Sequence, residues 1–154
     1  MPSDLYVEQA LIQHKRSSQA LLCVDVTDFE QDLRDFVRTL RHNALAWDVV
    51  SQCPRIDLES WWNDILDRAE NSYGPAELRW PRAEDERLAL LAGLLTSMAT
   101  ETLCTFREFG AALNCHTSCQ AVLAVQELVA RPFCDLLEAR LAAFAEAAER
   151  RLAS

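Results

Sequence analysis

The spacing of the apolar residues constrains the fold of this chain more than any other feature. Between residues 83 and 113 they recur at intervals of three and four, which places them on one face of an α-helix: Leu88, Leu91, Leu95, Met98, Thr102, Phe106, Phe109 and Leu113, with one threonine in the stripe. The same period continues along the rest of the chain, without the strict alternation of a half-buried strand. The sequence therefore predicts an all-α protein.

Local signals divide this pattern into five predicted helices, over residues 4–23, 27–50, 58–73, 83–113 and from 117 to the C-terminus. Helix starts are indicated by two capping-box patterns and one aspartate N-cap, and a stop and a kink by an asparagine suited to left-handed backbone and a proline: Thr27–Glu30, Thr117–Gln120, Asp57, Asn114 and Pro132. The segment 72–81 holds two prolines and a glycine and is the one long predicted loop.

The two C-terminal helices are predicted to form the frame of the fold. A tight turn at Cys115 and His116 joins them, so we expect a long antiparallel hairpin against which the three shorter helices pack. No internal repeat or change of composition divides the chain. Residues 1–154 are therefore expected to form a single-domain bundle of about five helices.

The charge of the chain excludes several classes of partner. There are 24 Asp and Glu residues against 15 Lys and Arg, a net charge of −9. Nucleic acids and anionic membrane surfaces require a basic footprint, so we expect neither as a partner. Three glycines are too few and too scattered for a phosphate-binding loop. No secretory leader is recognisable and no apolar run reaches the ~18 residues of a membrane span, so a cytoplasmic location is expected.

The predicted interhelix turn gathers three soft metal ligands, Cys115, His116 and Cys119, within five residues. Thiolate and imidazole suit zinc and copper(I), so a zinc or copper site is one hypothesis for this turn. No second ligand pair completes a set of four, and cysteine is commonly a small buried residue. The six cysteines are expected to be free thiols, with the metal site as the alternative.

The sequence offers no convergent set of catalytic residues. None of the three histidines (His14, His42 and His116) follows a glutamate by three residues, as helical di-iron sites require. His14 and His42 lie mid-helix, where a phosphoacceptor histidine would, but the His-x-x-Lys-Gly pattern is missing at both. Cys115 and His116 are sequence neighbours without an orienting third group, and GxSxG does not occur. We therefore expect a protein that is not an enzyme and needs no cofactor.

The tryptophans are the remaining candidates for function. Neighbours on a helix point ~100° apart, so Trp61 and Trp62 cannot both face one core. Trp61 is expected to face inward. Trp62 is either buried beneath the loop that carries Trp80 or partly exposed beside Tyr73. Exposed aromatic residues anchor protein interfaces, which makes Trp62, Tyr73 and Trp80 the candidate partner-binding residues.

The sequence thus favours a non-enzymatic protein-interaction module, such as an adaptor, a chaperone-like protein or a regulatory subunit, acting through an acidic helical surface with exposed aromatics. The alternative is a bundle that binds a small molecule in an interhelix pocket, or a metal at the cysteine turn. The apolar stripe of residues 88–113 is suited to pairing two copies of the chain, but an intramolecular hairpin requires the same stripe.

Overall fold

The computed structural model describes residues 4–71 and 74–153, and every regular element in them is a helix. The helices are α1 (Asp4–Cys23), α2 (Phe29–His42), α3 (Ala44–Ser51), α4 (Leu58–Glu70), α5 (Glu84–Thr100), α6 (Phe106–Ala112), α7 (Ser118–Val125) and α8 (Arg131–Ala153), with a π-helical turn, Gln126–Ala130, between the last two. The all-α prediction is confirmed.

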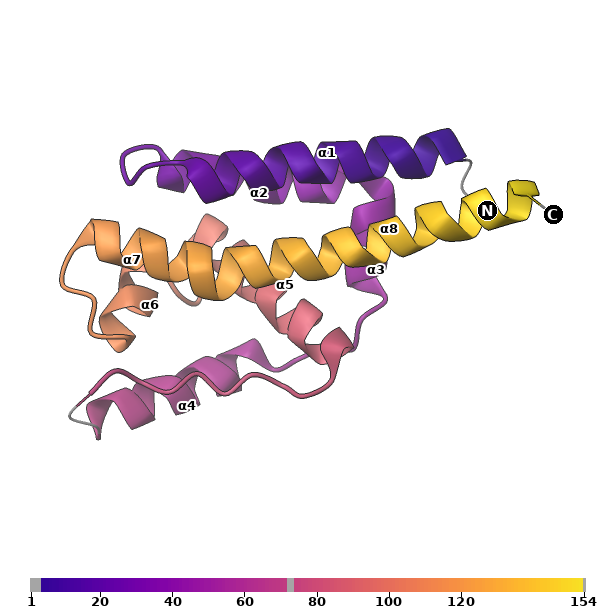
Figure 1. Ribbon diagram of the computed structural model, residues 1–154. Coiled ribbons are helices and arrows are strands. Elements are labelled where there is room, and N and C mark those ends of the chain that lie inside the picture. Colours follow the sequence, from indigo (N-terminus) through magenta and orange to yellow (C-terminus); the bar gives the residue numbers. More distant parts are fainter. Residues whose placement is uncertain (1–3, 72–73, 154) are drawn as a thin grey trace.

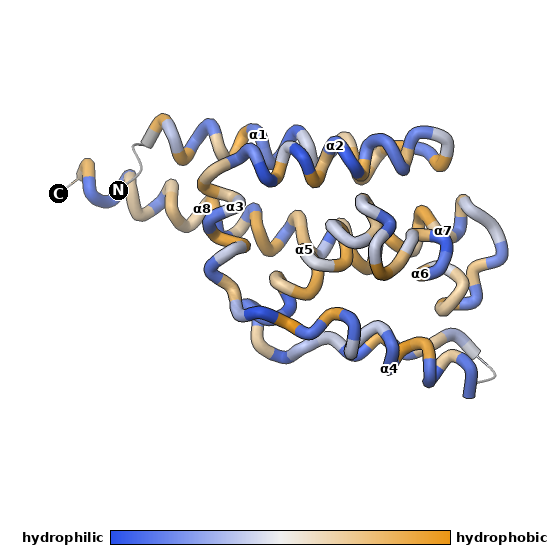
Figure 2. The backbone as a smooth tube through the Cα atoms, turned by 180° about the vertical axis from the view of Figure 1, so that it is seen from behind, coloured by the Kyte–Doolittle hydropathy of each residue, from blue (hydrophilic) through white to orange (hydrophobic). Residues whose placement is uncertain are grey.

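The helices form three tiers (Figure 1). The first tier is the pair α1 and α2, which pack against each other, and α1 also packs along α8. The second tier contains α8 and α5, and α5 contacts α2, α3 and α8. The third tier is α4 with the loop that follows it, and α4 packs on α5 and α6. The turns of α1 and α2 carry both apolar and polar residues, as amphipathic helices at a core surface do (Figure 2).

The predicted helix over 27–50 is divided at Asn43 into α2 and α3. Asn43 is buried, and its side chain donates to the carbonyl of Ala10 in α1 (2.9 Å) and accepts from the backbone N–H of Ala46 (3.3 Å). One amide thus caps α3 and ties it to α1. The start expected at Thr27 is also wrong: the Asp25 carboxylate accepts the backbone N–H groups of Thr27 and Asp28, and α2 begins at Phe29.

The predicted helix over 83–113 is divided as well, so the long two-helix hairpin does not form. Glu101 has left-handed backbone (φ 54°), and the Ser97 hydroxyl accepts the backbone N–H groups of Leu103 and Cys104. Helix α6 then starts at a complete capping box between Thr105 and Glu108. This Thr-x-x-Glu pattern is the sequence signal for the break. The 88–113 stripe lies almost wholly within the core of this chain, so it is not a surface for a second copy.

Other predicted helix ends are confirmed. Asp57 caps α4 by accepting from Ser60 N–H, and Thr117 caps α7 by accepting from Gln120 N–H. Asn114 has left-handed backbone (φ 61°). The N–H groups of Asn114 and Cys115 bond to the carbonyls of Ala111 and Gly110, which is a Schellman motif.

Pro132 distorts the last helix without ending it. In the π-helical turn before it, the Arg131 N–H bonds to the Gln126 carbonyl, five residues back. This insertion accommodates a proline whose ring would clash with the preceding turn of a regular α-helix. The turn also positions Gln126, which is buried and donates to the carbonyls of Leu21 (3.1 Å) and Val24 (3.0 Å). Gln126 therefore completes the hydrogen bonding at the end of α1.

The close approach of α6 and α7 depends on Gly110. A Cβ at this position would lie 2.5 Å from Ala121 Cβ and 2.9 Å from Ala121 Cα. We expect Gly110→Ala to lower the free energy of unfolding by about 1–3 kcal/mol through overpacking. Gly93→Ala is the matched control, because its nearest contact would be Leu58 Cδ2 at 3.4 Å, and it should be neutral or stabilise the helix by up to ~1 kcal/mol. Urea denaturation measures both, and equal effects would contradict this packing.

His14 makes the stability of the α1–α8 contact depend on pH. It is 2% exposed, its Nε2 lies 3.0 Å from the Cys134 carbonyl oxygen, and burial lowers its pKa below 6.5 although that hydrogen bond and Glu138 act in the opposite direction. Below pH 6.5 the unfolded chain therefore binds a proton that the folded chain does not. Stability should fall as pH drops through this range, with a slope of up to ~1.4 kcal/mol per pH unit until the folded pKa is reached.

The measurement is urea denaturation between pH 7.5 and 5 for the wild type, His14→Gln and His42→Gln. His14→Gln should lose this component of the pH dependence. His42→Gln should retain it, because His42 is exposed and bonds only to the Arg38 carbonyl of its own helix. Identical pH profiles for the wild type and His14→Gln would contradict the assignment.

Candidate functional site

An apolar groove of about 470 Å³ lies between α5 and the segment that leads from α3 to α4. Trp47 and Val50 of α3 line one part of it, and residues 53–56 of the connecting segment and Leu58 of α4 continue this wall. Leu103, from the turn after α5, lines another part. We call this feature the α5 groove. Its volume is within the range of known ligand sites, and most of its lining side chains are apolar.

The floor of the α5 groove consists of small side chains on one face of α5: Ala89, Ala92, Gly93 and Thr96. Their spacing of three and four residues puts them on one face of α5, roughly 120° around the helix from the stripe of Leu88, Leu91 and Leu95, which are buried in the core. A hollow results because no side chain here is long enough to fill the space beside the helix. A partner's backbone or large apolar side chains can therefore approach α5 closely.

The walls of the groove are held by local hydrogen bonds. The Cys53 thiol donates to the Val49 carbonyl at the end of α3, and the Asp57 cap fixes the first turn of α4. At the other end, the Ser97 hydroxyl bonds organise the turn that carries Thr102 and Leu103. The groove is thus a preformed feature of helices and their caps.

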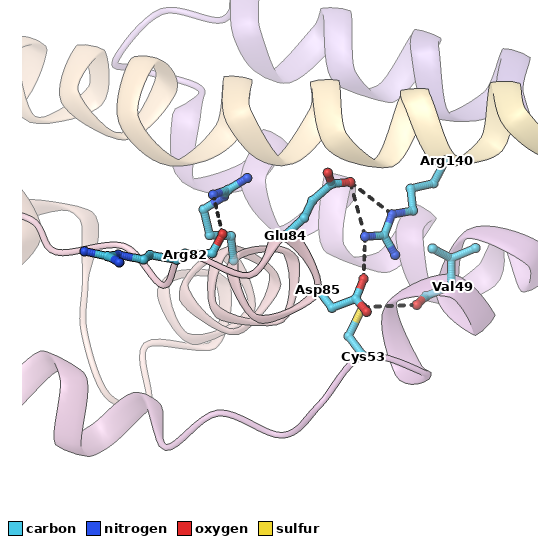
Figure 3. Close-up of polar contacts among 7 residues, drawn as sticks. Val49, Cys53, Arg82, Glu84, Asp85 and Arg140 are labelled. Carbon is cyan, nitrogen blue, oxygen red and sulfur yellow. Dashed lines mark hydrogen bonds and ion pairs between the residues drawn. The ribbon is translucent and has the colours of Figure 1, made fainter.

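An ion-pair cluster joins the start of α5 to α8 (Figure 3). The Arg140 guanidinium bonds to the Glu84 carboxylate (3.2 Å) and to that of Asp85, and these two pairs raise the pKa of Arg140. Glu84 and Asp85 are in the first turn of α5, where a negative charge also interacts favourably with the helix dipole. The cluster sets the position of the helix whose outer face is the groove floor.

The groove contains little ionisable chemistry. Arg55 is the one charged residue among its lining residues, all of which belong to the described part of the chain. Cys53 is the one lining thiol, and its pKa is raised, first by burial and then by Asp85, against a smaller opposite effect of Arg140. A thiol kept protonated in this way is a poor nucleophile. The lining is therefore suited to binding by shape and apolar contact.

Of the two alternatives left open for Trp62, burial is the one found. Trp62 is 2% exposed and stacks on Phe109 of α6, with ring centroids 6.2 Å apart. The alternative of a partly exposed Trp62 is excluded, because this face of α4 is the one turned to α6. Trp61, expected to face inward, stacks on Trp80 of the loop at 5.3 Å, and its Nε1–H donates to the Arg79 carbonyl. Both stacked rings are half-buried. Tyr73 lies outside the described residues.

The candidate ligands of the cysteine turn, Cys115, His116 and Cys119, are not grouped as metal ligands. Cys115 is half-buried, whereas His116 and Cys119 are exposed. The turn is organised by Gln120, whose side chain accepts from the His116 N–H, and by the Thr117 cap. Across the described ranges, no group of three or more His, Cys, Asp or Glu residues is placed to hold a metal ion. The structure therefore does not assemble Cys115, His116 and Cys119 into a zinc or copper site.

Sequence reasoning missed the α5 groove, although part of its signal was visible. Ala89, Ala92, Gly93 and Thr96 form a small-residue stripe beside the leucine stripe of the same helix. What the sequence does not show is that α4 and the 53–58 segment stand beside this stripe without covering it. That arrangement depends on the break at Asn43, which was not predicted.

Comparison with known proteins identifies no relative: no protein-family model, no curated protein and no solved structure matches this chain. Among the helices that the structure describes, none is long and apolar enough to cross a membrane.

The cysteines should differ widely in reactivity in the native protein. Burial raises the pKa of the Cys104 thiol to about 12 and that of Cys134 to about 11, while Cys23 and Cys119 are exposed. At pH 8 we expect alkylation of Cys104 and Cys134 to be roughly a hundredfold or more slower, because few thiolates form there. Peptide mass spectrometry after timed labelling measures this, with denatured protein as the control.

The same labelling tests the metal hypothesis. Added zinc should leave the labelling rates of Cys115 and Cys119 unchanged if the turn is not a metal site. Selective protection of both cysteines by zinc would contradict this arrangement of the turn.

Proposed function

We propose that this protein is a non-enzymatic protein-interaction module, and that a helix of a protein partner docks in the α5 groove. The observation that carries the proposal is the preformed apolar groove with a floor of small side chains. Helix-in-groove recognition needs such a surface, since an amphipathic helix buries its apolar face there. Half-buried Trp47 in the wall adds an aromatic contact of the kind that contributes strongly to interfaces.

The ionisable groups of the groove support docking in preference to catalysis. A catalytic pocket brings together groups with matched roles, such as a nucleophile and a base. Arg55 and the protonated Cys53 do not make such a set. The half-buried Trp61–Trp80 pair lies on the same tier as Leu58 and is a second, smaller contact surface in this proposal.

The alternative function, binding of a small molecule, uses the same groove. Its volume of about 470 Å³ favours this reading as well, since many ligand pockets have this size. Native mass spectrometry of the purified protein separates the two, because a retained ligand adds a defined mass to the chain. A stoichiometric adduct would favour the alternative.

The docking proposal is tested by filling the groove. Ala89→Trp places an indole on the groove floor at a half-buried helical position. Leu123→Trp is the matched control, because Leu123 is 58% exposed on α7 and outside the groove. Both variants should keep the wild-type circular dichroism spectrum and cooperative unfolding.

Each tagged variant is then used for affinity capture from cells that express this chain. A stoichiometric partner retained by the wild type and Leu123→Trp should be lost with Ala89→Trp, by at least about tenfold, since an indole excludes the partner's side chains from the floor. A partner held equally by all three proteins would place the docking surface elsewhere.

A further inference from the structure

We propose that the helix received by the α5 groove is acidic: an amphipathic segment whose apolar stripe is flanked by Asp or Glu residues. This inference rests on the proposed function, and it names the chemistry of the partner. It is unexpected from the net charge of −9, which by itself would attract basic segments.

The charges at the groove favour an acidic segment. Its one charged lining residue is the cation Arg55, and no carboxylate is among the lining residues described. A second cation stands at the Trp47 wall, where the Arg41 guanidinium lies 5.6 Å from the ring centroid. Two cations therefore border the groove, at Arg55 and at the Trp47 wall, although the whole chain is acidic and Asp85 raises the pKa of Cys53.

Within residues 4–71 and 74–153, these two arginines have no acidic partner. Carboxylates outnumber cations in the chain, and some of the arginines are paired with them, as Arg107 is with Glu30 and Arg131 with Glu127. In the described residues, neither Arg41 nor Arg55 forms an ion pair with Asp or Glu. Both are exposed, so an incoming carboxylate can reach them. The ring face of Trp47 holds the Arg41 guanidinium beside the groove, and its N–H groups can donate to a partner carboxylate.

The shape of the floor also favours such a helix. Ala89, Ala92 and Gly93 carry no long side chains, so the hollow above them has room for large apolar side chains that point toward α5, with Leu58 at the Gly93 edge. A partner helix that presents Leu or Phe at positions i, i+3, i+4 and i+7 would fill this space. Carboxylates on the edges of that stripe would then lie near Arg55 and Arg41. Charge and shape together specify the partner segment.

The test is a selection from a displayed library of helical peptides. The apolar stripe is randomised among large hydrophobic residues, and the flanking positions are randomised among Glu, Gln and Lys. Clones are selected on the wild-type protein and counter-selected on Ala89→Trp, so that only groove-dependent binders remain. The readout is the composition of the flanking positions in these clones.

Enrichment of Glu at the flanks supports the inference. Enrichment of Lys or Gln among groove-dependent clones would overturn it and leave the docking function standing. The absence of groove-dependent clones would overturn both the inference and the docking function. The three results are therefore distinguishable.

Charge reversal then assigns the contacts. For an enriched acidic clone, Arg55→Glu and Arg41→Glu should each raise the dissociation constant by roughly two- to fivefold, which is the scale of exposed ion pairs. Arg16→Glu is the control, since it makes the same change of charge at an exposed position of α1 away from the groove. An equal effect of all three reversals would show a general charge effect and overturn the assignment of the two arginines.

Discussion

The rest of the structure depends on the burial of α5. The leucines of this helix are packed against α2, α3 and α8, so the helix is enclosed on most of its circumference. Removing such side chains from water is the main favourable contribution to folding a chain of this size. The one side of α5 that is incompletely covered carries small residues, and it forms the floor of the groove. The core and the candidate site are therefore two faces of one element.

Buried polar groups determine how the helices fit around this core. Asn43, Gln126 and Ser97 each bond to backbone groups at a helix end, where the regular hydrogen-bond pattern is incomplete. Two of these contacts join segments distant in sequence, since Asn43 reaches α1 and Gln126 reaches the α1–α2 connection. An unpaired backbone group in the core would be costly, so these bonds favour this arrangement over other packings of the same amphipathic helices. Arg140 adds an electrostatic restraint at the surface.

The groove links this architecture to the proposed function. Binding in the groove requires no conformational change of this chain, because the walls of the groove end in hydrogen-bonded caps and its floor is a core helix. Preformed surfaces of this kind bind at a lower entropic cost than surfaces that must become ordered. The acidic surface attracts positively charged partners over long distances. Arg41 and Arg55 attract negatively charged groups close to the groove. This combination would select a partner that carries an acidic docking helix on a body that the acidic surface does not repel.

The sequence by itself determined the all-α class, most of the core positions and several helix ends, including the caps at Asp57 and Thr117 and the left-handed Asn114. These features follow from the three-and-four spacing of apolar residues and from hydrogen bonds between near neighbours, both of which are local. Only the tertiary structure decided the break at Asn43, the burial of Trp62 in place of Trp61, and the hollow beside Ala89 and Gly93. Each of these depends on a contact between distant segments: Asn43 with α1, Trp62 with Phe109, and α5 with the 53–58 segment. Helical periodicity indicates which face of a helix is apolar, but not which neighbour covers that face or where coverage stops.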